Sequence, residues 1–156
     1  MSAAIPESRL PTLRELYASH DGKVSDKWSL YLDVYDRVLA RHRLGPVAFV
    51  EIGVQNGGSL ELWARYLPRA TVLVGCDIDP KCAALAFRDP RIRVVVGDVN
   101  TEQAYRAIRD LAPGFDVFID DGSHTSRDIV LTFCNYFRHV NAGGTYVVED
   151  LHCSYE

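Results

Sequence analysis

Five short apolar segments, each ending in acidic residues, constrain the fold of this chain more than any other feature. They cover residues 47–53, 71–79, 92–98, 115–121 and 143–150. Strands that are apolar on both faces are typical of a parallel sheet covered by helices on both sides. The stretches after the first four have helical character, over residues 59–67, a short piece after Pro80, 101–111 and 125–140. The sequence therefore predicts an α/β domain, Rossmann-like and doubly wound, with a mainly parallel sheet.

Two of the expected helices carry apolar residues at helical spacing. Ahead of the first strand, Trp28, Tyr31 and Tyr35 recur at this spacing, with Ser25 or Asp26 available as the N-cap. We expect these aromatic residues to pack in the core against the sheet, and a position over a bound cofactor is the weaker alternative. In the helix over 125–140, one face carries Ile129, Val130, Phe133, Phe137 and Val140.

Composition excludes several classes of protein. The 156 residues are 47% hydrophobic, enough for the core of one domain. A formal net charge of −4 and scattered basic residues oppose nucleic-acid binding. No apolar run reaches the roughly 18–20 residues that span a bilayer, and the N-terminus lacks a secretory signal pattern. Four cysteines without a CxxC pair predict reduced thiols in a cytoplasmic protein.

All five predicted strands end in acid, and the carboxyl ends of parallel strands meet at one edge of a sheet, where ligands bind. The acids are Glu51, Asp77, Asp79, Asp98, Asp120, Asp121, Glu149 and Asp150. A single acid of this kind often caps the following helix. Several together repel one another unless a cation or hydrogen-bond donors lie among them. The sequence therefore predicts a site for a cation, for a ligand rich in hydroxyl and amino groups, or for both.

The turn after the first strand, EIGVQNGGS, indicates the type of ligand. Gly53, Gly57 and Gly58 allow close approach of the backbone to a ligand, although a tight turn without a ligand is an alternative. Gln55 stands where a dinucleotide fingerprint has its second glycine, which disfavours a nicotinamide dehydrogenase. Asp77 can accept hydrogen bonds from ribose hydroxyls and Asp98 from an adenine amino group. The pattern favours an adenosine ligand without a phosphate cluster.

The segments VEIGVQNGG, VGCDIDP and VVGDV resemble, in this order, the cofactor motifs of class I S-adenosylmethionine-dependent methyltransferases. More narrowly, EIGVQNGGSLELW, GCDIDPKC, FDVFIDDGSH and VVEDLHCSY resemble the macrocin and mycinamicin sugar O-methyltransferases and the cephalosporin-hydroxylase-like proteins. The resemblance implies a methyltransferase domain over 25–156 that lacks the last two strands and is C-terminally incomplete. Residues 1–24 would form an N-terminal extension. Either the chain is a fragment, or another chain, such as a second copy, covers the open sheet edge.

The resemblance also implies roles for individual residues. The cofactor S-adenosylmethionine would have its methionine end at Glu51, Gly53 and Gly57, its ribose at Asp77, its adenine at Asp98 and its amino group near Asp120. Within the same motifs, the remaining expected cofactor contacts are Asn56, Ser59, Ile78 and Val99. Asp121, Glu149 and Asp150 would hold Mg²⁺ or Mn²⁺. His124 would be the general base, with His152 a second candidate for site chemistry.

Physical reasoning supports this metal site. If the fourth and fifth strands are neighbours, their ends lie about 5 Å apart, so that Asp121 and Glu149 can reach one ion. Oxygen ligands favour Mg²⁺, and coordination makes a substrate hydroxyl more acidic, so that a nearby imidazole can take its proton. Alternatively, Asp121-Gly122 is a plain turn and Ser123 or Thr125 an N-cap.

The sequence thus predicts a metal-dependent O-methyltransferase. Its acceptor would be a small molecule with a vicinal diol, namely a sugar or a glycosylated natural product. The enzyme would then act in natural product biosynthesis. The catalytic residues would be His124 and Asp121. The alternative is a non-catalytic cofactor-binding or partner subunit.

Overall fold

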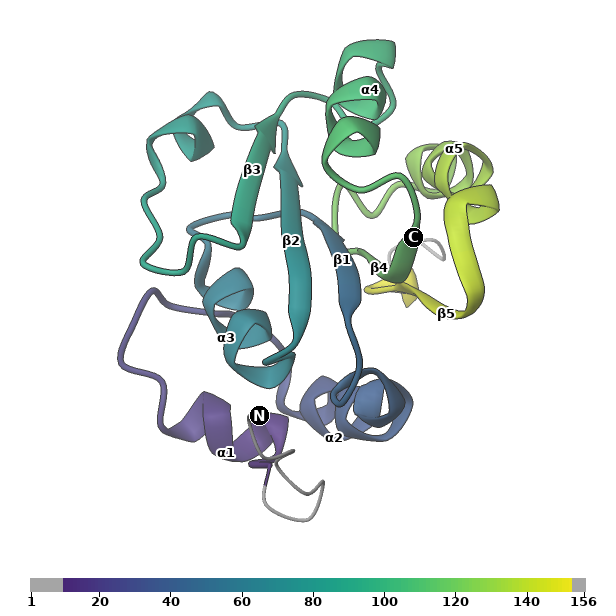
Figure 1. The fold of residues 1–156 in the computed structure, drawn as a ribbon. Helices are drawn as coiled ribbons and strands as arrows, with labels where there is room; N and C mark the ends of the chain where they lie inside the picture. The colour runs from purple at the N-terminus through teal and green to yellow at the C-terminus, as the bar shows by residue number, and fades with distance from the viewer. Residues whose placement is uncertain (1–9, 153–156) are drawn as a thin grey trace.

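The computed structural model describes residues 10–152, and its centre is a five-stranded sheet in the order β3-β2-β1-β4-β5 (Figure 1). The strands are β1 (Val47–Ile52), β2 (Ala70–Asp77), β3 (Ile92–Val96), β4 (Phe115–Asp120) and β5 (Val140–Val148). Every neighbouring pair is parallel. The chain order reverses between β1 and β4, so a switch point of the kind that binds ligands lies at their carboxyl ends. The predicted α/β class and parallel sheet are confirmed.

Helices cover both faces of the sheet, as predicted for a doubly wound fold (Figure 1). The first face is covered by α1 (Leu13–Ala18), α2 (Ser29–Leu39) and α3 (Gly58–Tyr66), which share a buried core with β1, β2 and β4. The second face is covered by α4 (Glu102–Leu111) and α5 (Ser126–Tyr136). Short 3-10 turns follow α2 (η2, Ala40–His42), β2 (η3, Pro80–Ala84) and α5 (η4, Phe137–His139). Leu13 and Leu16 of α1 are buried in the first core, so residues ahead of 25 pack against the domain.

Local sequence explains where several helices begin. Thr12 forms a capping box with Glu15 at the start of α1. Thr101 accepts a hydrogen bond from the Ala104 N–H, and Thr125 accepts one from the Asp128 N–H. Each threonine satisfies a backbone donor that has no partner within its helix. Thr125 is therefore the N-cap of α5, one of the two candidates that the sequence offers.

The approach to α2 differs from the prediction. The helix begins at Ser29 and its N-cap is Trp28, so the predicted N-caps Ser25 and Asp26 are wrong. The reason is that Lys27, just ahead of the helix, points into the sheet edge and forms ion pairs there. Trp28 is 59% exposed, so the core packing predicted for it is also wrong, whereas Tyr35 is buried.

The end of α5 also differs. The helix stops at Tyr136, a 3-10 turn follows, and β5 begins at Val140 instead of residue 143. The predicted apolar face is largely exposed at Val130, Phe133 and Phe137. Phe133 and Phe137 stack on each other and contact Tyr146 of β5. They remain exposed because β5 is the edge strand of the sheet within the described residues.

Two further findings bear on the expectations from composition. Between residues 10 and 152, no helix has both the length and the apolar character needed to cross a membrane. Cys76, Cys82 and Cys134 are free thiols, and Cys153 lies outside the described residues.

Candidate functional site

The carboxyl ends of β1, β4 and β5 meet in register at one edge of the sheet. Asp120 pairs with Ile52 on one side and with Val148 on the other. Beyond these pairs, the Asp121 N–H donates to the Ile52 carbonyl at 3.0 Å, and the Glu149 N–H donates to the Asp120 carbonyl at 2.9 Å. Strand pairing therefore brings Asp121 and Glu149 side by side, as expected from neighbouring fourth and fifth strands.

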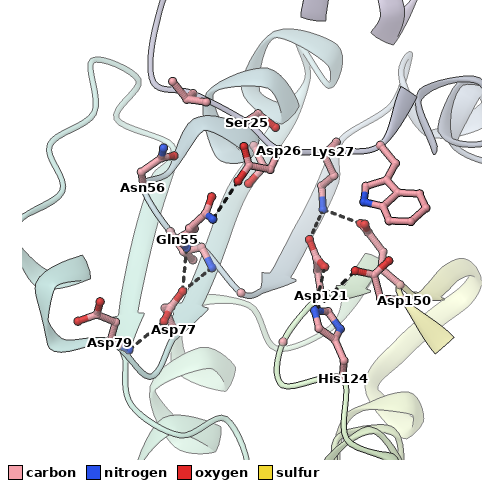
Figure 2. A pocket seen from close by; sticks show the side chains of 17 residues that line it. Ser25, Asp26, Lys27, Gln55, Asn56, Asp77, Asp79, Asp121, His124 and Asp150 are labelled. Atoms are coloured by element: carbon pink, nitrogen blue, oxygen red, sulfur yellow. Dashed lines mark hydrogen bonds and ion pairs between the residues drawn. The ribbon is translucent and has the colours of Figure 1, made fainter. Parts of the chain in front are cut away.

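Two adjoining cavities lie at this edge, with volumes of about 450 and about 220 Å³. Gly53, Asp77 and Gly122 line both. The larger cavity, drawn in Figure 2, also contains the predicted residues Asn56, Ser59, Asp121, His124, Glu149 and Asp150. The smaller cavity also contains Ile78, Asp98, Val99 and Asp120. Two predicted cofactor residues, Glu51 and Gly57, line neither cavity.

Two glycines of the first turn have steric roles. Gly53 has φ +87°, and a Cβ atom there would lie 2.0 Å from the carbonyl oxygen of Asp121. Gly57 also has φ +87°, and a Cβ atom there would lie 2.6 Å from the ring of Phe87. Only glycine adopts this conformation readily and permits these contacts. Gly53 thus lets the ends of β1 and β4 touch, while Gly57 serves packing at the start of α3.

Asp77 holds the glycine turn in place (Figure 2). Its Oδ2 accepts hydrogen bonds from the N–H groups of Val54 at 2.7 Å and Gln55 at 2.8 Å. Its Oδ1 accepts one from the Asp79 N–H at 2.9 Å. Each carboxylate oxygen offers two acceptor sites, so both sites of Oδ2 are in use and one site of Oδ1 is left for a ligand hydroxyl.

Asp120 combines burial with an unused acceptor. It is 4% exposed, and its Oδ2 atom is buried without a hydrogen-bond partner. Burial raises the pKa of this carboxyl group to about 6, despite a backbone hydrogen bond from Gly122 that lowers it. A buried unsatisfied acceptor is costly, so this oxygen is suited to a donor supplied by a ligand in the smaller cavity.

The sequence analysis missed Lys27, which lies among three of the site's acids. Its Nζ atom lies 2.6 Å from Asp121 Oδ2, 2.5 Å from Glu149 Oε1 and 3.1 Å from Glu51 Oε1. The side chain is 6% exposed. Burial acts to lower the pKa of Lys27, but the three carboxylates outweigh it and raise that pKa above its ordinary value. Lys27 is therefore charged. The repulsion among the acids was a signal for such a cation, but nothing in the sequence around Lys27 identifies it.

Glu51 is completely buried beneath the larger cavity. Besides the Lys27 ion pair, it accepts hydrogen bonds from Ser59 Oγ at 2.6 Å and from Trp63 Nε1 at 3.0 Å. Three donors thus compensate one buried carboxylate, as burial of a charge requires. Glu51 connects β1 to α3 and to the segment ahead of α2.

Asp121, His124 and Asp150 form a cluster of donor atoms that all lie within 4.8 Å of one another. His124 Nε2 is 3.8 Å from Asp121 Oδ1 and 3.8 Å from Asp150 Oδ2 (Figure 2). Glu149, the remaining member of the predicted metal trio, is turned toward Lys27 and the hydroxyl of Tyr35. Burial raises the pKa of Glu149 to about 7, against the lowering effect of Lys27. Two carboxylates that open onto a cavity suit a hard divalent cation such as Mg²⁺.

Backbone conformation marks the same cavity. Among residues 10–152, three residues other than glycine have positive φ: Gln55 at 51°, His124 at 57° and Asp150 at 54°. All three line the larger cavity. A left-handed conformation costs such residues about 1–2 kcal/mol and is concentrated at functional sites. The strained backbone supports a functional role for this cavity.

Comparison with known proteins gives one family. Residues 50–151 match a family profile described as a methyltransferase domain. The 8-demethyl-8-alpha-L-rhamnosyl tetracenomycin-C 2'-O-methyltransferase of Streptomyces olivaceus is 37% identical over 96% of this chain and 44% of its own length. The mycinamicin VI 2''-O-methyltransferase of Micromonospora griseorubida is 34% identical over 95% of this chain and 38% of its own length.

A solved structure agrees with these relatives. The MycE methyltransferase from the mycinamycin biosynthetic pathway, in complex with Mg, SAH and mycinamycin VI, superposes with a TM-score of 0.78. It is 35% identical in sequence, and the match covers 93% of this chain and 40% of that one. The present chain spans less than half the length of the curated relatives described above.

Proposed function

The chain belongs to the family of methyltransferase domains, and from this premise we propose that it transfers the methyl group of S-adenosylmethionine to a hydroxyl group. The observation that carries the proposal is the pair of adjoining cavities at the switch point: expected cofactor residues line both of them, and the larger one also contains Asp121, Asp150 and His124. We assign this activity to the domain over residues 25–156, with 1–24 as an N-terminal extension.

The cofactor would extend across both cavities. Gly53, Asn56 and Ser59 would lie at the methionine end, and the remaining acceptor site of Asp77 Oδ1 would take a ribose hydroxyl. The adenine would lie in the smaller cavity against Ile78, Asp98 and Val99. The unsatisfied Oδ2 of Asp120 is suited to the amino group of the methionine part. Glu51 and Gly57 would stabilise the glycine turn between β1 and α3 without touching the cofactor.

Asp121 and Asp150 would hold Mg²⁺ or Mn²⁺. Glu149 would be the third ligand. A bound divalent cation makes a coordinated hydroxyl group more acidic. His124 is placed to take the hydroxyl proton at Nε2, and the imidazolium that results lies 3.8 Å from a carboxylate oxygen on either side. Bound S-adenosylmethionine would supply its sulfonium methyl group to the hydroxyl oxygen, with S-adenosylhomocysteine as the second product.

We propose an acceptor with neighbouring hydroxyl groups on a sugar or a glycosylated natural product. The named substrates of the relatives support this class: a rhamnosyl tetracenomycin in one case and mycinamicin VI in another. Two adjacent hydroxyls suit the open side of the acidic cluster, where one is methylated and its neighbour helps orient the sugar.

The test combines binding and turnover. We expect calorimetry to show S-adenosylhomocysteine binding, and a rhamnosylated tetracenomycin acceptor to be methylated only when Mg²⁺ is present. His124→Asn should retain cofactor binding and lose turnover, whereas His139→Asn, which lies beside Tyr105 and away from the site, should retain both. Turnover in excess EDTA would refute the metal role. Binding without turnover would favour a non-catalytic cofactor-binding subunit.

A further inference from the structure

Three side chains from one short stretch reach the three acids of the proposed metal site. Lys27 lies in the extended residues just ahead of α2, and Tyr31 and Tyr35 follow at intervals of four on the helix. Lys27 Nζ is 2.6 Å from Asp121 Oδ2, and the Tyr31 hydroxyl donates to Asp150 Oδ1 at 2.7 Å. The Tyr35 hydroxyl donates to Glu149 Oε1. Residues four apart lie on one face of a helix, so this spacing presents both tyrosines to the same sheet edge.

These contacts use one side of each carboxylate. In Asp121, Lys27 contacts Oδ2, while Oδ1 lies 3.8 Å from His124 Nε2. In Asp150, Tyr31 contacts Oδ1, while Oδ2 lies 3.8 Å from the same His124 nitrogen. The two oxygens that Lys27 and Tyr31 leave open therefore face one point in the cavity. Figure 2 shows Lys27, Asp121, Asp150 and His124 gathered around this point.

Tyr31 also supports the backbone of Asp150. The Asp150 N–H donates to the Tyr31 hydroxyl at 3.3 Å, so one hydroxyl group contacts both the main chain and the side chain of this residue. Asp150 has φ 54°, a conformation that persists only where surrounding contacts fix it. Tyr31 is thus placed to stabilise a strained residue in the orientation that directs Oδ2 toward the cavity.

We propose that Lys27, Tyr31 and Tyr35 are positioning residues of the metal site. Each of them contacts one carboxylate oxygen, in Asp121, Asp150 and Glu149 respectively. These contacts orient the three carboxylates for a divalent cation before the cation binds. Groups that orient metal ligands in this way contribute about 10–100-fold to metal affinity. This inference rests on the proposed metal-dependent function. All three residues lie outside residues 50–151, the part that matches the methyltransferase profile.

Tyr31→Phe gives the sharpest test, because it removes one hydroxyl group and keeps the ring. We expect Mn²⁺ titration of the full chain, followed by electron paramagnetic resonance of free Mn²⁺, to show at least tenfold weaker binding. S-adenosylhomocysteine affinity in metal-free buffer should stay unchanged. Tyr66→Phe is the matched control, since Tyr66 is fully buried in α3, where its ring contacts Arg43 and Trp63. Its Mn²⁺ affinity should equal that of the unaltered protein.

A second variant and a double variant keep the inference falsifiable. Tyr35→Phe should also weaken Mn²⁺ binding, through Glu149. In the Asp150→Asn background, Tyr31→Phe should cause little further loss, because its target carboxylate is already gone. If Tyr31→Phe and Tyr35→Phe both bind Mn²⁺ as tightly as Tyr66→Phe, the tyrosines are packing residues and the inference is wrong. An equal loss in all three variants would also overturn it. Failure of the unaltered protein to bind Mn²⁺ would instead refute the metal-dependent function itself.

Discussion

Replacing Asp120 with asparagine should make the metal-free, cofactor-free protein more stable at neutral pH. The Asp120 pKa is raised by burial from its ordinary 3.8 to about 6. The folded protein therefore holds this proton more tightly than the unfolded chain does. The stabilising contribution of the protonated form is fully present below pH 3.8 and is lost as the pH rises through about 6. Above that pH the fold contains a buried carboxylate that asparagine would replace with a neutral group.

The size of this gain in stability follows from the shift in the pKa of Asp120. Each pKa unit corresponds to about 1.4 kcal/mol, so a shift of about two units sets an upper limit of about 3 kcal/mol. We expect Asp120→Asn to raise the free energy of unfolding by about 2–3 kcal/mol at pH 7.5 and by almost nothing near pH 4. Because the carboxylate is also the proposed partner of the cofactor's amino group, S-adenosylhomocysteine binding should weaken in the same variant.

Urea denaturation in EDTA, repeated from pH 4 to pH 8, measures this difference directly. Asp110→Asn, at an exposed position in α4, is the control and should change the free energy of unfolding by no more than about 0.5 kcal/mol. An Asp120→Asn protein that is no more stable than the unaltered chain at pH 7.5 would refute the reasoning. A gain that does not vary with pH would refute it as well, since the cause could not then be ionisation.

Three other substitutions test the architecture of the site. Lys27→Met leaves buried carboxylates without their cation and should cost about 3–5 kcal/mol in urea denaturation; an unchanged midpoint would contradict the role of Lys27. Gly53→Ala should lower the free energy of unfolding more than Gly143→Ala does. Both glycines have positive φ, but only a Cβ at position 53 would lie against Asp121. Equal losses of stability would leave backbone strain as the sole cause. Asp77→Asn deprives at least one backbone N–H of its acceptor. It should therefore lower the free energy of unfolding by about 1–3 kcal/mol and weaken S-adenosylhomocysteine binding. Calorimetry checks both.

The strands and the convergence of the acids could be predicted because both follow from local patterns. Apolar runs of five to nine residues define the strands, and parallel pairing then brings their carboxyl ends to one edge. Element ends were less accurate where tertiary contacts decided them. The approach to α2 stays extended because Lys27 points into the site, and α5 exposes Phe133 and Phe137 because it covers the edge strand.

The partners of the acids could not be read from the sequence. Lys27 meets Asp121 and Glu149 across separations of 94 and 122 residues, and Tyr31 meets Asp150 across 119. No periodic pattern connects positions so far apart. The helical spacing of Tyr31 and Tyr35 was visible, but the same spacing serves core packing, and Tyr35 is in fact buried. Only the folded arrangement shows that both hydroxyl groups face acids.

Repulsion among the acids requires positive charge, and the protein supplies part of that charge itself. Lys27 lies on the deep side, where it contacts Asp121, Glu149 and Glu51 and is 6% exposed. Asp121, His124 and Asp150 lie on the cavity side, with 21–28% of each side chain exposed. A permanent internal cation thus stabilises the acids when no ligand is bound, while their outer oxygens stay accessible to exchangeable ligands. Removing Lys27 should therefore affect folding first, whereas removing the Tyr31 hydroxyl should affect metal binding first.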